Sequence, residues 1–149
     1  MIKKIISMVL SCVLSLLLSS AWAADVASQV AVQDEFPLVV GHRTLTTFRV
    51  GILAYSSKDR VEAAQLRLDR VLEAARGGHV RSQPIAPPGT GVAILLDDQL
   101  VFTVQPGDVN ELAGDTMDGM VENAVTQLQH VYTERTERRD FRARRILLG

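Results

Sequence analysis

Residues 56–78, "SSKDRVEAAQLRLDRVLEAARGG", decide the fold class of this 149-residue chain. Apolar side chains recur there at helical spacing and charged side chains take the other positions, which predicts an amphipathic helix. Ser56 or Ser57 is the expected N-cap, because a serine oxygen accepts a free backbone N–H of the first turn. Gly77 is the expected left-handed stop, with Arg76 near the negative end of the helix dipole. The apolar positions are Val61, Ala64, Leu68, Val71, Leu72 and Ala75, and the charged ones are Arg60, Glu62, Arg67, Asp69, Arg70 and Glu73.

The segment before this helix predicts a β-hairpin. A short apolar run is followed by Gly41 and His42, which suit a two-residue turn. The strand after the turn is rich in β-branched and aromatic residues and is expected to continue to Ala54. Leu45 and Phe48 have opposite parity along that strand, so we expect a β-bulge near the two threonines between them.

Three further strands are predicted after the helix. Residues 80–85 form one strand, and Pro84 makes it an edge strand because proline cannot donate to a ladder. Residues 92–104 form a second hairpin with Asp97 and Asp98 at its turn. A hairpin tip places both carboxylates in water, so turn chemistry explains them better than a role as paired catalytic carboxylates.

A long helix is predicted to begin near Thr116, with Asp115 or Thr116 as its cap. Its apolar stripe ends at Tyr132, and the following residues are polar on every side. Two ion pairs of the i,i+4 type are expected beyond that point, from Glu134 to Arg138 and from Asp140 to Arg144. The apolar stripe consists of Met117, Met120, Val121, Ala124, Leu128, Val131 and Tyr132.

The predicted order of elements is ββαβββα, which indicates an α+β fold. Each helix has one apolar face to bury, so we expect a two-layer sandwich. It would have a mainly antiparallel sheet of about five strands and two helices on one face, with the C-terminal helix extending from the body. The expected domain covers residues 37–132, after a linker at residues 24–36 and before a basic membrane-proximal helix end at residues 133–149.

Residues 1–23 have the layout of a cleaved secretory signal peptide of bacterial type. Lys3 and Lys4 precede an apolar run, and small residues before the cleavage point end at Ala23. An uncleaved anchor and lipidation of Cys12 are the alternatives. Cys12 lies inside the apolar run, so the mature chain would have no cysteine and no disulfide. These features predict a location in the periplasm or on the outer face of the inner membrane.

No motif predicts catalysis, a metal site or a bound cofactor. His42, His79 and His130 are far apart and none has another histidine at helical spacing, whereas catalytic zinc needs three clustered ligands. Asp108 and Asn110 fit the first positions of a calcium loop, but the following positions do not. No serine is placed beside an activating histidine. The chain is therefore predicted not to be an enzyme, with a periplasmic enzyme kept as the least favoured hypothesis.

The distribution of charge suggests a functional surface at the C-terminal end. Residues 25–132 carry a net charge of −6, and residues 133–149 carry +3. Inner-membrane lipids fit these arginines better than nucleic acid, because the chain is exported and its body is acidic. A solvated helix end is the simpler explanation. The candidate membrane-proximal residues are Arg138, Arg139, Arg142, Arg144, Arg145, Ile146, Leu147 and Leu148.

Two long stretches resemble a known family. These are "LVVGHRTLTTFRVGILAYSSKDRVEAAQLRL" at residues 38–68 and "VAILLDDQLVFTVQPGDVNELAG" at residues 92–114. They are similar to the extracytoplasmic N-terminal domain of some bacterial proteins in the small-conductance mechanosensitive channel family. In that family the hairpin turns read Asp-Gly, whereas here they read Gly-His and Asp-Asp.

The resemblance implies a sensor or support module, not a pore, because no pore-lining helix is part of the sequence. The expected partner is a channel transmembrane region entered after the last helix, and a homo-oligomer is considered as the assembly state of the domain. The alternative is a free-standing periplasmic binding or adaptor protein that contacts the inner membrane through its basic tail.

Overall fold

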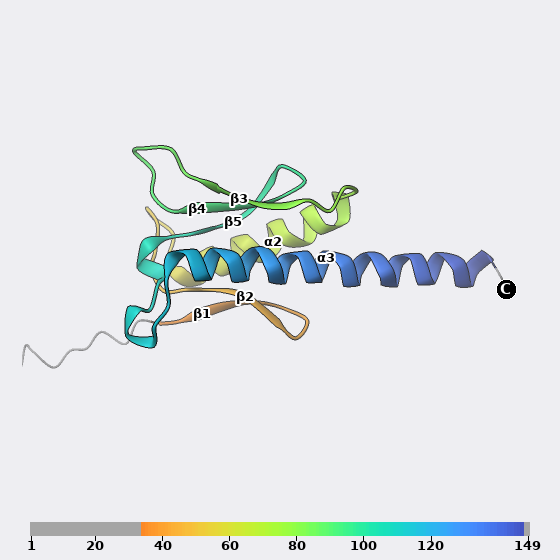
Figure 1. Cartoon of the computed structure of the whole chain (residues 1–149), viewed down its shortest axis with the longest axis horizontal. Helices are drawn as coiled ribbons and strands as arrows, with labels where there is room; N and C mark the ends of the chain where they lie inside the picture. Colours follow the sequence, from red (N-terminus) through yellow and green to blue (C-terminus); the bar gives the residue numbers. More distant parts are fainter. Residues whose placement is uncertain (1–33, 148–149) are drawn as a thin grey trace, which may run out of the picture. The chain divides into compact units, whose positions relative to one another are not determined.

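A computed structural model describes residues 34–147 of the chain (Figure 1). The predicted signal peptide, Cys12, most of the linker and Leu148 lie outside these residues. The observed order confirms the α+β class and the predicted order of strands and helices. The elements are β1 (Phe36–Val40), β2 (Arg43–Phe48), α2 (Ser57–Ala74), β3 (Val80–Pro84), β4 (Val92–Leu96), β5 (Gln99–Val104), the 3₁₀ helices η1 (Pro106–Asp108) and η2 (Glu111–Ala113), and α3 (Met117–Leu147).

The five strands form two antiparallel sheets in place of the expected single sheet. One sheet contains β1 and β2, and the other has the order β3-β4-β5, with β3 at an edge as predicted. Helix α2 contacts β1, β2 and β5, and α3 contacts β2 and all three strands of the second sheet. The two helices therefore do not cover one face of one sheet. Each helix packs against both sheets, and both run between them in Figure 1.

The loop after β2 begins earlier than the sequence predicts. Strand β2 ends at Phe48, well before the predicted limit at Ala54. The chain then reverses through a short turn in which Ile52 and Tyr55 exchange backbone hydrogen bonds of 2.8 and 2.9 Å. Leu53, in this turn, has a φ of 54°, a left-handed conformation outside the regular strand region.

The predicted bulge lies in β2. Leu38 pairs with Thr46 and Val39 pairs with Thr44, so Leu45 is the extra residue without a partner. This shift turns both Leu45 and Phe48 toward the interior, where their exposed fractions are 0% and 1%. The bulge thus allows Leu45 and Phe48, which would face opposite sides of a regular strand, to be buried in the same core.

The core lies between the two sheets and the two helices. Helix α2 contributes the predicted stripe and α3 contributes Ala124, Leu128 and Val131. The rings of Phe48 and Phe102 meet edge to face across the two sheets, with their centroids 6.2 Å apart. The buried residues of this core cluster are Leu38, Leu45, Phe48, Ala64, Leu68, Val71, Leu72, Ala75, Ile94, Leu96, Val101, Phe102, Val104, Ala124, Leu128 and Val131.

The start of α2 follows the prediction and its end does not. Ser56 is the N-cap: its hydroxyl accepts from the Asp59 N–H at 3.1 Å, and the Asp59 carboxylate accepts from the Ser56 N–H at 2.9 Å. The expected stop at Gly77 is wrong, because Ala75 ends the helix in an extended conformation. Gly78 takes the positive φ of 72°, and a Cβ there would lie 2.1 Å from the Tyr132 ring of α3.

The Asp97 carboxylate has a structural role that the sequence did not reveal. It lies at the β4–β5 turn, and its two oxygens accept from the backbone N–H groups of Arg76, Gly77 and His79 at 2.8 to 2.9 Å. The hydrogen bond from His79 is the largest influence on the pKa of Asp97. Together with the other backbone N–H groups it outweighs desolvation and lowers the pKa from 3.8 to about 2.

Because the pKa of Asp97 is depressed in the fold, its stabilising contribution is complete above about pH 4 and is lost as the pH falls through about 2. We expect Asp97→Asn to lower the free energy of unfolding by about 1–2 kcal/mol at pH 7 and to flatten its decline between pH 4 and 2. Urea unfolding at several pH values measures both effects. Asp98→Asn is the matched control, since Asp98 also has a positive φ but its carboxylate is exposed and pairs only with Arg81. Equal pH profiles for the wild type and D97N would contradict this role.

Helix α3 passes from the core into solvent. Thr116 is its cap, since its hydroxyl accepts from the Gly119 N–H at 3.1 Å. Side chains are buried or half-buried at intervals as far as Thr136, and every residue from 137 to 146 is exposed. The 31 residues of the helix span about 46 Å. In the described residues 34–147, no helix combines the length and the apolar character that a membrane span requires.

Candidate functional site

Two places in the described domain bring functional groups together, and the first is a buried ion pair. The Arg60 guanidinium donates to both carboxylate oxygens of Asp108 at 2.8 Å. It also donates to the backbone oxygens of Val50 and Thr103 and lies 4.3 Å from the centroid of the Phe48 ring. The side chains of Arg60 and Asp108 are 7% and 0% exposed.

Asp108 is held as a carboxylate by its surroundings. Desolvation by burial would by itself raise the pKa of Asp108. Hydrogen bonds from the Arg60 guanidinium and from the N–H groups of Arg49 and Gln105 outweigh that effect and keep the pKa below its usual value. Both carboxylate oxygens of Asp108 accept hydrogen bonds from the protein. The pair therefore connects α2 to η1 and does not present a free acid or base. A cavity of about 410 Å³ lies beside it, between the Phe48, Tyr55 and Phe102 rings.

The sequence pattern predicts neither member of this pair as buried. It predicts Arg60 on the charged face of α2, but Arg60 lies four residues before Ala64 and therefore shares the face of the apolar stripe. That spacing was the available signal. Asp108 partly fits the pattern of a calcium loop, and the structure shows it fully buried in a salt bridge.

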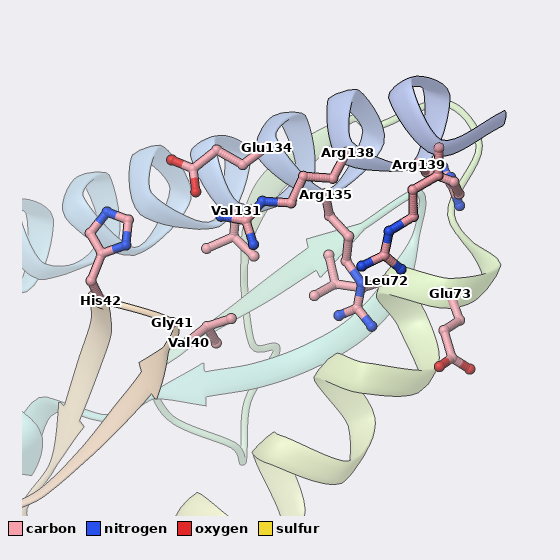
Figure 2. Close-up of a pocket in the computed structure, with 11 residues that line it drawn as sticks. Val40, Gly41, His42, Leu72, Glu73, Val131, Glu134, Arg135, Arg138 and Arg139 are labelled. Atoms are coloured by element: carbon pink, nitrogen blue, oxygen red, sulfur yellow. The ribbon is translucent and has the colours of Figure 1, made fainter. Parts of the chain in front are cut away.

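The second place is a groove where α3 leaves the body. It has a volume of about 620 Å³ and lies between the β1–β2 turn, the end of α2 and the basic part of α3 (Figure 2). Its floor is apolar and its wall on α3 is basic. The lining residues are Val40, Gly41, His42, Leu72, Glu73, Val131, Glu134, Arg135, Arg138, Arg139 and Arg142.

Ion pairing at the groove differs from the prediction. Glu134 does not pair with Arg138. Its carboxylate accepts from two nitrogens of Arg43 at 2.6 and 3.1 Å, and this hydrogen bonding lowers the pKa of Glu134. Arg43 comes from β2, so a contact across the fold replaces the local one. The other expected pair, from Asp140 to Arg144, is not formed either.

Three arginines of the groove have no acidic partner among residues 34–147. Arg135 lies 3.8 Å from Asp69 of α2. Within residues 34–147, no carboxylate forms a salt bridge with Arg138, Arg139 or Arg142. In Figure 2 Arg135 and Arg139 descend from α3 toward α2, and Arg138 lies on the side of Glu134. These guanidinium groups therefore surround a hollow with an apolar floor.

The predicted membrane-proximal residues fall into two groups. Arg138, Arg139 and Arg142 line the groove. Arg144, Arg145 and Ile146 lie farther along α3, are exposed, and do not line it. Leu147 is the last residue of the helix, and Leu148 lies outside the described residues. The structure thus divides one basic patch of the sequence into a groove and a helix end.

The histidines are not gathered by the fold. His42 lies at the rim of the groove in the β1–β2 turn, and His79 and His130 are exposed elsewhere. In the described part of the chain no three histidine, cysteine, aspartate or glutamate side chains are close enough together to hold a metal ion. The groove itself combines basic side chains of α3 with apolar ones.

The fold and the groove define an α+β domain with two small sheets and a basic C-terminal helix. A family model described as "Domain of unknown function (DUF8459)" matches residues 37–135, more than half of the 149 residues. The chain belongs to this family. No curated protein and no solved structure matches it. The matched region covers both sheets and ends at Arg135, so three of the groove's arginines follow it.

Proposed function

We propose that this domain is a non-enzymatic periplasmic module of a mechanosensitive-channel-like membrane protein, in which α3 connects the body to the membrane. The observation that carries the proposal is the continuity of α3. One helix is seated in the core through Ala124, Leu128 and Val131 and then continues with every side chain from residue 137 to 146 exposed. A continuous helix transmits a displacement of one end to the other.

The chemistry of the exposed end supports a position at the lipid headgroups. Arginines near an anionic surface gain on the order of 1 kcal/mol each. Phe141 and Ile146 are 71% and 81% exposed and would add apolar contact at the same level. The acidic body would be repelled from the same surface, which orients the domain with α3 toward the membrane. In this position the domain acts as a sensor or support for a transmembrane region.

The groove favours a second candidate function. A free-standing periplasmic binding or adaptor protein would use the same helix end to touch the inner membrane and the groove to hold a ligand. Reading the encoding DNA beyond Gly149 separates the two versions. An in-frame apolar segment supports the channel module, and a stop codon with no apolar segment nearby supports the adaptor.

Vesicle flotation of the full chain tests the membrane role common to both versions. We expect binding to vesicles containing phosphatidylglycerol and weak binding to vesicles of phosphatidylcholine alone. Arg144→Gln with Arg145→Gln should weaken binding to the anionic vesicles about 25-fold, since each charge contributes on the order of 1 kcal/mol. Lys58→Gln with Arg70→Gln removes the same charge from the exposed side of α2 and is the matched control. Equal losses in the two double variants would show that net charge, not the end of α3, drives binding.

A further inference from the structure

We infer that the groove between α3 and the body binds one anionic phospholipid molecule, with its phosphate on the arginines and the start of an acyl chain on the apolar floor. The inference deepens the proposed membrane role, since it names the partner of the same end of the domain. It concerns one lipid molecule bound in the groove, which is a different event from adsorption of the helix end to a membrane surface.

The charge of the groove selects an anion. Arg138, Arg139 and Arg142 have no salt-bridge partner among the described residues, whereas the carboxylate of Glu134 is already bound by Arg43. A guanidinium matches two phosphate oxygens with parallel N–H donors and is more weakly hydrated than an ammonium group. A cluster of arginines with free donors therefore fits a phosphodiester.

The floor of the groove selects an amphiphile over a simple phosphate. Val40, Leu72 and Val131 form it, and they come from β1, α2 and α3. Leu72 and Val131 belong to the core and are 2% and 6% exposed, so the floor is backed by packed side chains and keeps its shape. Val40 is half-buried, and covering it with CH₂ groups removes apolar surface from water, at roughly 25 cal/mol per Å².

The size and the walls of the groove favour a single small molecule over a peptide. Its volume of about 620 Å³ lies within the range of about 300–1,000 Å³ typical of small-molecule sites. Among the residues that line the groove only Val40 belongs to a strand, so little strand edge is available there to pair with an extended peptide. Glu73 at the rim disfavours a second negative charge, which suits a headgroup with one charge, such as phosphatidylglycerol.

Calorimetric titration of the full chain with dihexanoyl phosphatidylglycerol below its micelle concentration tests the inference. We expect binding to this lipid and at least tenfold weaker binding to dihexanoyl phosphatidylcholine, which has the same chains and no net charge. Glycerol phosphate, which has no chain, should also bind at least tenfold more weakly. Arg139→Gln with Arg142→Gln should weaken binding about 25-fold, and Glu73→Gln should strengthen it about fivefold. An acidic amphipathic peptide that binds the groove more tightly than the lipid would overturn the inference.

The matched control is Arg144→Gln with Arg145→Gln, which removes two charges from the same helix beyond the groove. It should leave binding of the short-chain lipid unchanged, and an equal loss would show diffuse attraction in place of a site. Val40→Trp should block the floor and abolish lipid binding, while flotation with anionic vesicles is retained. If V40W is misfolded by circular dichroism, the exposed arginine pairs still decide the question. If the wild-type chain binds the short-chain lipid but does not float with anionic vesicles, the proposed membrane role is wrong and the groove site is still supported.

Discussion

Replacing Asp108 by alanine is expected to lower the free energy of unfolding by about 3–5 kcal/mol, because the change leaves the buried Arg60 guanidinium without its counter-charge. It also removes the acceptor of the N–H groups of Arg49, Val50 and Gln105. Each of these donors would lie unsatisfied in a closed environment. Chemical denaturation monitored by circular dichroism measures the loss.

Asp115→Ala is the matched control for Asp108→Ala. Asp115 also faces an arginine, with 3.6 Å between its carboxylate and Arg49, but its side chain is 38% exposed. Exposed pairs contribute about 0–1 kcal/mol, so the control should change stability little. A second variant removes both charges, Arg60→Met with Asp108→Leu, and should recover part of the loss. A cost below about 1 kcal/mol for D108A would show that the pair is not a structural centre of the domain.

Replacing Leu128 by alanine is expected to destabilise the domain by about 2–5 kcal/mol. Leu128 is 0% exposed and lies in the part of α3 that packs against both sheets. The change removes buried methyl groups and leaves a cavity that the surrounding strands and helices close only partly. Because the packing of Leu128 in the core holds α3 to the body, the variant also tests the contact on which the proposed function depends.

Leu66→Ala is the control for Leu128→Ala. It makes the same chemical change in a helix, but Leu66 is 68% exposed on α2. We expect a change within about 0.5 kcal/mol, since surface substitutions away from special features have small effects. Thermal and urea unfolding of both variants give the comparison. A similar cost at the two positions would contradict the assignment of Leu128 to the core.

Much of the fold was predictable because it depends on local patterns. The stripe of α2, the serine cap, the two hairpin turns and the end of the apolar stripe at Tyr132 are all properties of neighbouring residues. The bulge in β2 was also predictable, since Leu45 and Phe48 cannot otherwise share a core. These patterns are sufficient for the order of elements and the α+β class.

Contacts between distant residues were not predictable. Glu134 has a suitable local partner in Arg138, yet it binds Arg43, which is 91 residues away. Asp97 was expected in water at a hairpin tip, and it instead binds three N–H groups after α2. Local spacing predicts which neighbouring residues a side chain can contact. It does not predict which distant segment packs beside that side chain.

The class of the fold, the order of its elements and the change of α3 from apolar to basic follow from local sequence patterns, because periodicity, capping and charge act over a few residues. The packing of the whole domain was needed to show that the strands form two sheets with both helices packed against each of them. It likewise decided that Arg60 and Asp108 form a buried pair and that three arginines face an apolar floor. These features depend on the packing of segments far apart in the chain, where burial, not local spacing, selects the partners.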